Sequence, residues 1–172
     1  MFVPVFISCV IIVTSFVLYK WRAKKTPIVI ITDIGTDPDD ILAIMVACAV
    51  QKFDILAVIT TGGDTINRGR VARRWLDIAG MDPDVPVIPD MAPGSGNTTC
   101  FIPEDTPSKE ESFLTIGKEG EDLAANALVK LARDYRKDLG IFVIGPLTPL
   151  GKLANLILKL FSKLDFYPFK DN

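Results

Sequence analysis

Four aspartates stand within eight residues, in the acidic loop Asp33-Ile34-Gly35-Thr36-Asp37-Pro38-Asp39-Asp40. Carboxylates this close together repel one another unless a cation or solvent screens their charge. A hard divalent cation such as Ca²⁺ takes about six to eight oxygen ligands and would convert that repulsion into binding. A solvated turn that caps the next helix would use the same residues. The residue types alone leave both interpretations open.

Two other loop chemistries fit this segment less well. An EF-hand needs a twelve-residue loop that ends in Glu, and the spacing here differs. A phosphate-binding loop needs a glycine-rich run followed by Lys, whereas aspartates would repel a phosphate. Gly35 allows a backbone turn that a residue with a Cβ atom would resist. The segment therefore favours a cation over an anion.

Histidine is absent from all 172 residues, and the cysteines are three: Cys9, Cys48 and Cys100. Without histidine, Ser-His and Cys-His catalysis, most zinc sites and a histidine general acid are excluded. The odd number of cysteines, without paired spacing, predicts free thiols rather than a disulfide framework. The absence of histidine excludes more candidate functions than any other feature of the composition.

Alternating strands and helices must position the acidic loop. Strands are predicted at residues 28–31, 55–60, 85–88 and 141–144, the first two of them buried, and helices at 41–50, 65–79, 119–137 and 150–160. This order predicts an α/β fold with an open, mostly parallel sheet and helices on both faces. In such sheets ligands bind beyond the carboxyl ends of the strands, which is where Asp33 lies. We also expect Asp39 or Asp40 to cap the first of these helices.

Residues 1–25 differ from the rest of the chain. Phe2 to Leu18 carry no charge, and Tyr19, Trp21 and four basic residues follow them. This pattern predicts a short transmembrane helix with an aromatic and basic flank, and so a single-pass membrane anchor on a cytoplasmic domain of residues 26–172. The alternative is a signal peptide, cleaved before secretion.

Residues 89–118, rich in Pro, Gly, Ser and Thr, predict a long loop of the kind that forms functional lids.

The charge of the globular part argues against nucleic acid as a partner. The net charge of the chain is −2, but residues 26–172 hold 15 basic and 21 acidic side chains. Nucleic-acid binding needs a basic face. Arg68, Arg70, Arg73 and Arg74 cluster in one predicted helix, where we expect a solvated surface rather than a nucleotide-binding face.

Three segments together resemble the inosine/uridine-preferring nucleoside hydrolases. Ile30 to Ala43 is similar to that family's N-terminal aspartate signature. Val58 to Asp64 resembles its second strand, and Ile144 to Leu150 resembles its Gly-Pro-Leu-Thr turn. The order and spacing of the three segments agree with the family across residues 27–158.

The resemblance implies a role for each matching residue. Asp33 matches a metal-ligating aspartate that also activates the attacking water, and Asp40 matches a second metal ligand. Asp39 matches the carboxylate that binds the ribose hydroxyls. The backbone carbonyl of Thr148 matches a main-chain metal ligand, and Asp64 stands where many members place a ribose-binding asparagine. The implied cofactor is Ca²⁺.

The implied activity is Ca²⁺-dependent hydrolysis of the N-glycosidic bond of ribonucleosides. One alternative stays open: a membrane-anchored metal- or ribose-binding or regulatory module without catalysis. A phosphotransferase of haloacid-dehalogenase type, with Asp33 as nucleophile, is disfavoured because it would leave the Gly-Pro-Leu-Thr turn unexplained. The expected partners are a ribonucleoside and the membrane, and a homo-oligomer is left open.

The chain departs from the family pattern at Ile31, where a further aspartate is usual, and at Pro149, where asparagine is common. The family's later sugar-binding asparagine, metal-binding aspartate and histidine have no counterparts in these residues. We therefore expect the N-terminal portion of a longer fold, and we do not expect turnover by this chain alone.

Overall fold

The computed structural model describes residues 25–50, 52–91, 100–108, 111–116, 122–152 and 154–155. The transmembrane helix predicted within residues 1–25 lies outside these residues, apart from Lys25 at its end. Among the helices that are described, none is long and apolar enough to cross a bilayer.

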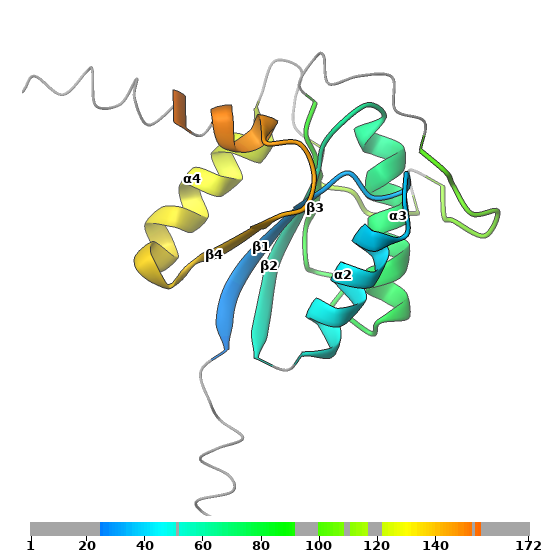
Figure 1. Ribbon diagram of the computed structural model, residues 1–172, viewed down its shortest axis with the longest axis horizontal. Helices are drawn as coiled ribbons and strands as arrows, with labels where there is room; N and C mark the ends of the chain where they lie inside the picture. Colours follow the sequence, from blue (N-terminus) through cyan, green and yellow to red (C-terminus); the bar gives the residue numbers. More distant parts are fainter. Residues whose placement is uncertain are drawn as a thin grey trace, which may run out of the picture.

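Four strands form one parallel sheet, in the order β3-β2-β1-β4. The strands are β1 Thr26–Thr32, β2 Phe53–Thr60, β3 Val87–Pro89 and β4 Gly140–Val143. β1 pairs in parallel with both β2 and β4, so it forms the centre of the sheet beneath the acidic loop (Figure 1). Each predicted strand is confirmed, with its ends shifted by no more than two residues.

Helices cover both faces of the sheet, as predicted. α2 (Asp39–Ala49) and α3 (Thr65–Ile78) lie on one face and α4 (Leu123–Tyr135) on the other, followed by the short 3-10 turn η1 (Arg136–Asp138) (Figure 1). The expectation that Asp39 or Asp40 caps α2 is wrong: Pro38 occupies the cap, and no side chain there bonds to the helix. Both aspartates instead stand in the first turn, where the partial positive charge of the helix end favours carboxylates.

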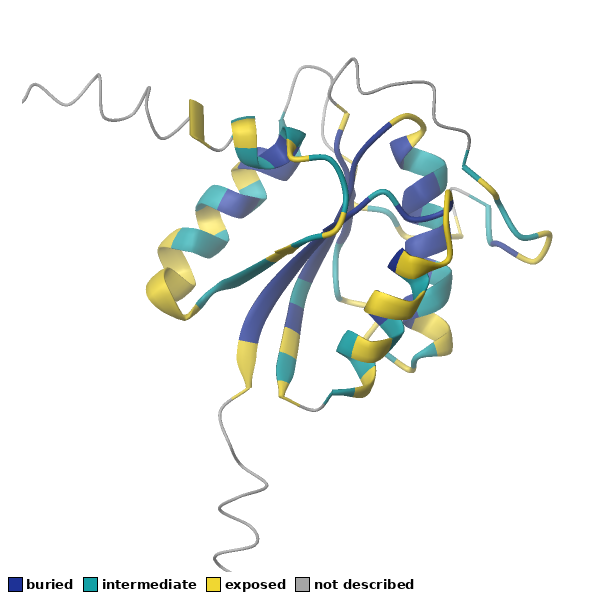
Figure 2. Ribbon diagram, viewed as in Figure 1, coloured by how far each residue is buried: buried dark blue, intermediate teal, exposed yellow. Residues whose placement is uncertain are grey.

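Side chains of β1 alternate between two apolar layers. Ile28 and Ile30 pack on the side of α2 and α3, whereas Val29 and Ile31 pack on the side of α4. All four are buried, because the central strand is covered on both faces (Figure 2). Burial of each such side chain contributes about 1.5–3 kcal/mol relative to exposure. This buried strand ends at Thr32, so Asp33 lies at the carboxyl end of the sheet.

The described parts of the long loop lie against the rest of the fold. Thr115 N–H donates to the Val87 carbonyl over 2.9 Å, beside β3. Phe101 N–H donates to the Gly35 carbonyl over 2.6 Å, so the chain at residues 100–101 meets the acidic loop. That contact is consistent with the predicted functional loop, and whether it acts as a lid stays a prediction.

Candidate functional site

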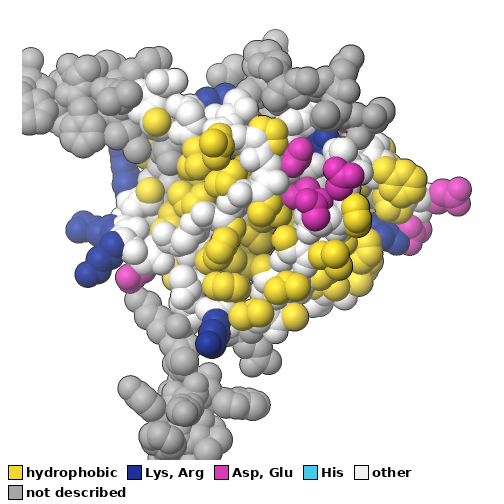
Figure 3. All heavy atoms as spheres, viewed as in Figure 1, with side chains coloured by type: hydrophobic (Ala, Val, Ile, Leu, Met, Phe, Trp, Pro, Cys, Tyr) yellow, Lys and Arg dark blue, Asp and Glu magenta, His cyan; other side chains and the backbone are white. Residues whose placement is uncertain are grey.

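The carboxyl ends of β1, β2 and β4 meet beside Asp33. Thr61 N–H donates to the Thr32 carbonyl over 2.9 Å, and Ile144 N–H donates to the Ile31 carbonyl over 2.9 Å. These bonds extend the pairing past the ends of the strands, so all three loops leave the sheet side by side. Acidic side chains gather at this end of the molecule (Figure 3).

Gly145 makes the closest approach to Asp33. A Cβ atom at Gly145 would lie 2.6 Å from the Asp33 amide nitrogen and 2.9 Å from its Oδ1, too close for any residue but glycine. At Gly62, a Cβ atom would lie 3.4 Å from both the Asp33 Cβ and the Pro146 Cγ. The three sequence segments that carry the family resemblance therefore meet at Asp33.

Asp33 and Asp40 differ in their surroundings. Asp33 is half-buried, whereas Asp40 is 5% exposed. The Thr32 hydroxyl donates to Asp40 Oδ1 over 2.7 Å and accepts from Ile34 N–H over 3.1 Å. Burial raises the pKa of Asp40, and the charges of Asp33 and Asp39 add to that, while the Thr32 hydrogen bond opposes it. Asp40 is thus a desolvated carboxylate beside other acidic groups.

Asp39, Asp37 and Asp64 are exposed at the same end of the sheet. Asp64 caps α3: its Oδ1 accepts from Asn67 N–H over 3.1 Å and its Oδ2 accepts from Asn67 Nδ2 over 2.5 Å. This capping role was not predicted, although Asp before a helix is a frequent cap. The ribose contacts expected of Asp39 and Asp64 stay predictions.

Thr148 opens a helical turn at residues 148–152, directly after the Gly145-Pro146 turn. Lys152, one turn further on, forms ion pairs with Asp90 at 2.7 Å and with Asp122 at 3.2 Å. Asp90 is buried at the end of β3, and Asp122 caps α4. Lys152 therefore ties the turn that carries Thr148 to two other elements of the fold.

The arginines of α3 are not the solvated surface that was expected. Arg68 is 0% and Arg73 3% exposed, and both donate to backbone carbonyls. Arg70 Nε donates to the Pro107 carbonyl over 2.7 Å, and Arg74 pairs with Asp105. The acidic charge of the domain had led us to expect a solvated helix face. Instead, backbone carbonyls of neighbouring loops accept hydrogen bonds from Arg68, Arg70 and Arg73 in place of water.

Sequence reasoning assigned no role to Thr32 or Arg68, yet both contact the acidic loop. Thr32 is the last residue of a buried strand, so its hydroxyl needed a nearby acceptor. Arg68 lies four residues after the Asp64 cap, on the helix face that also buries Thr65 and Ala72. That spacing was the available signal for its burial.

The donors at this site suit a hard cation in kind but are few. The predicted ligands are the Asp33 and Asp40 carboxylates and the Thr148 carbonyl, all oxygen. Within the described ranges, no three His, Cys, Asp or Glu side chains are grouped closely enough to hold a metal. In the same part of the chain, Thr61 Oγ1 is buried without a hydrogen-bond partner and adds an oxygen at this edge. The donor types thus suit a hard cation, and the roles of Asp33, Asp40 and Thr148 as Ca²⁺ ligands stay predictions.

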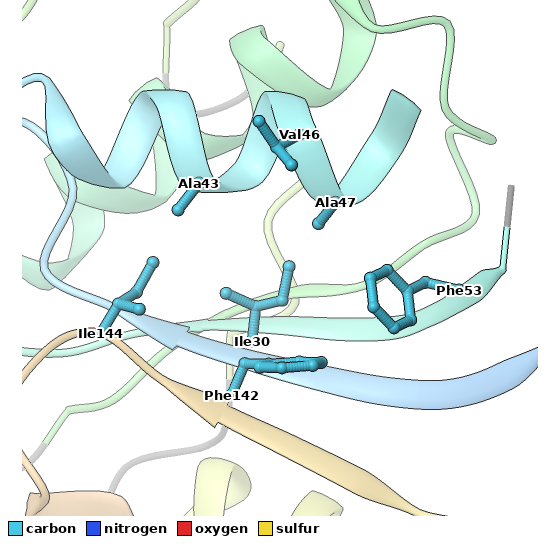
Figure 4. Close-up of a pocket in the computed structure, with 7 residues that line it drawn as sticks. All are labelled: Ile30, Ala43, Val46, Ala47, Phe53, Phe142 and Ile144. Carbon is cyan, nitrogen blue, oxygen red and sulfur yellow. The ribbon is translucent and has the colours of Figure 1, made fainter. Parts of the chain in front are cut away.

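A cavity of about 260 Å³ lies elsewhere, between α2 and the sheet. Figure 4 shows Ala43, Val46 and Ala47 of α2 facing residues of three strands and of the segment after β4: Ile30, Phe53, Phe142 and Ile144. The Phe53 and Phe142 rings meet edge to face, with centroids 5.4 Å apart. This apolar groove has no titratable lining residue and is not the candidate reaction site.

Residues 28–165 match the profile of the inosine-uridine preferring nucleoside hydrolases. The chain belongs to that family. The match covers all three segments that meet at Asp33, which confirms the resemblance drawn from them.

Solved structures share this fold. An inosine-guanosine nucleoside hydrolase superposes with a TM-score of 0.59 at 21% identity, over 80% of this chain and 45% of that one. The plant nucleoside hydrolase PpNRh1 gives 0.53 at 23% identity, over 76% and 43%. The type III effector XopQ, solved with adenosine diphosphate ribose, gives 0.61 at 19% identity, over 83% and 41%. The chain thus spans less than half the length of these proteins, and no curated protein sequence matches it.

Proposed function

We propose that this chain supplies the Asp33, Asp40 and Thr148 portion of a Ca²⁺-dependent ribonucleoside N-ribohydrolase site. The reaction converts a purine or pyrimidine nucleoside and water into ribose and the free base. The observation that carries the proposal is the meeting of three loops at Asp33, where Gly62 and Gly145 pack against that residue. Family membership supports the reaction class.

The residues divide the chemistry between them. A bound Ca²⁺ would supply Lewis-acidic charge that orients water and lowers its pKa. Asp33, half-buried at the end of β1, would accept the proton of the attacking water. Asp39, exposed in the same loop, would accept hydrogen bonds from the ribose hydroxyls and select ribosides. The carboxylates would stabilise the positive charge that develops on the sugar as the base departs.

The remaining ligands would come from outside the described residues or from the substrate. Three protein oxygens leave at least three positions of a Ca²⁺ shell open. Ribose hydroxyls, water or a further segment would complete it. The alternative function, a metal- or ribose-binding module without turnover, uses the same residues and differs in the absence of product.

Anchoring of the domain to a membrane by residues 1–25, on the cytoplasmic side, is a separate proposal, tested by fractionation of cells that express the full chain.

Ribose release tests the reaction. The full chain is incubated with inosine or uridine, with and without Ca²⁺, and the reducing sugar released is measured. Catalysis predicts Ca²⁺-dependent release that Asp33→Asn removes and that Asp37→Asn, in the same loop, retains. Ca²⁺ binding without any release would favour the binding module over the hydrolase.

A further inference from the structure

Arg68 is the largest fully buried side chain among the described residues, and its donors face the acidic loop. Its Nε donates to the Gly62 carbonyl over 2.6 Å. Its Nη1 donates to the Ile34 carbonyl over 2.8 Å and also to the Asp33 carbonyl, and its Nη2 donates to the Thr36 hydroxyl over 3.0 Å. One guanidinium therefore joins the loop after β1 to the loop after β2.

The acceptors explain why an arginine stands here. Burial of a cation is costly unless hydrogen bonds replace its lost water. A guanidinium presents five donors in a fixed plane and can reach several carbonyls at once, whereas an ammonium is a compact point charge. Most of these acceptors are backbone atoms, so Arg68 acts on the path of the main chain.

The main-chain path decides where the Asp33 carboxylate lies. Asp33 and Ile34 turn their carbonyls toward Arg68, and Gly35 follows with a φ of 99°, a conformation that L side chains rarely adopt. Loss of the guanidinium would release this turn. The positive charge also stabilises the Asp40 carboxylate, and so offsets part of the repulsion within the loop.

We propose that Arg68 is the positioning residue of the acidic loop: it holds the main chain of residues 33–36 against Gly62 and thereby places the Asp33 carboxylate for cation and ribose. The link to cation and ribose rests on the function proposed above. The placement of the loop does not, because the contacts of Arg68 with Gly62 and Ile34 involve only atoms of this chain.

Arg73 provides a matched control on the same helix. It is also buried, and its Nη1 donates to the Val85 carbonyl over 3.0 Å while its Nε donates to Asp77 over 2.7 Å. Its contacts lie away from the acidic loop. Arg68→Lys and Arg73→Lys therefore both remove a buried guanidinium and retain the charge, but only the first affects the loop.

Amide hydrogen exchange of the full chain without cation is the first measurement. The amides of residues 33–37 should exchange about 10-fold faster in Arg68→Lys than in the unchanged chain. Their exchange rate in Arg73→Lys should equal that of the unchanged chain. If Arg68→Lys does not fold, Thr36→Val removes a single contact at an exposed position, and a rise of about 3-fold is expected. Unchanged exchange in the variant that folds, or equal acceleration in Arg73→Lys, would overturn the proposal.

Calorimetric titration with Ca²⁺ alone is the second measurement. The Kd should rise about 10-fold in Arg68→Lys and stay within about 2-fold in Arg73→Lys. Equal Kd values in the two variants would overturn the assigned effect on the cation. Absence of Ca²⁺ binding by the unchanged chain would overturn the function proposed above, while the exchange result still decides whether Arg68 places the loop.

Discussion

Asp40, a predicted metal ligand, is a buried carboxylate at the start of α2. It is buried beside Asp33 and Asp39, so its ionised form is disfavoured in the protein without a cation. The Thr32 hydroxyl gives partial compensation through one hydrogen bond. A bound cation would supply the rest. We infer that the arrangement favours binding over stability at this position.

Asp40→Asn should therefore raise the Tm of the protein at neutral pH when no cation is added. Asparagine keeps an oxygen for the Thr32 hydroxyl but carries no charge. Because the folded pKa of Asp40 is raised, its contribution to stability is present at low pH and is lost as pH rises from about 3.9 through the folded value. The advantage of the variant should disappear in thermal melts at low pH. A Tm below that of the unchanged chain at neutral pH would contradict this account.

At the scale of elements, the site depends on how closely the turn after β4 approaches the acidic loop. Gly145 permits that approach because it has no Cβ atom. Gly151 lies in the helical turn that follows, where a Cβ atom would have no neighbour within 4 Å. Alanine substitutions at these two glycines therefore distinguish the effect of close packing on stability from the effect of backbone freedom.

Gly145→Ala should push Asp33 out of place and destabilise the chain by about 1–3 kcal/mol, as overpacking does elsewhere. Gly151→Ala should be neutral or stabilising by up to about 1 kcal/mol, because alanine favours helix. Urea denaturation of the two variants measures both effects. If Gly145→Ala and the unchanged chain have the same free energy of unfolding, the turn after β4 does not pack closely against Asp33.

The strands could be predicted from the sequence, whereas the contacts of Arg68 could not. The apolar runs of β1 and β2 predicted buried parallel strands, because a strand covered on both faces has little room for polar residues. The run of β4 predicted a strand, and its residues are only partly buried or exposed because β4 is an edge strand of the described sheet. The convergence of the three segments followed from the parallel order. The contacts of long side chains did not follow: helix spacing indicates that Arg68 lies on a buried face, but the Asp33 and Ile34 carbonyls that it contacts are 35 and 34 residues away, and residue spacing does not predict them.

At the scale of the whole molecule, the side of α2 that faces the apolar groove stays partly open. Val46 of α2 and Phe142 of β4 both line the groove, and they are 60% and 45% exposed (Figure 4). An apolar surface of this kind favours association in water. We predict that the chain self-associates through this surface.

Val46→Lys should lower this self-association and leave the Tm within about 2 °C, because the side chain is solvated. Ile44→Lys, two residues away on the same helix, should unfold the chain or cost more than about 3 kcal/mol, since Ile44 is 0% exposed. Sedimentation velocity at several concentrations and thermal melts separate the two. Undiminished association of Val46→Lys would exclude this face as the cause.

The central claim is that the acidic loop and the turn after β4 form part of a cation site. Calorimetric titration of the full chain with Ca²⁺ tests it most directly, with Asp33→Asn and Asp37→Asn as the paired variants. We expect a Kd of about 1 mM or tighter for the unchanged chain and for Asp37→Asn, and no measurable binding for Asp33→Asn. No binding by the unchanged chain, or equal binding by Asp33→Asn, would contradict the claim.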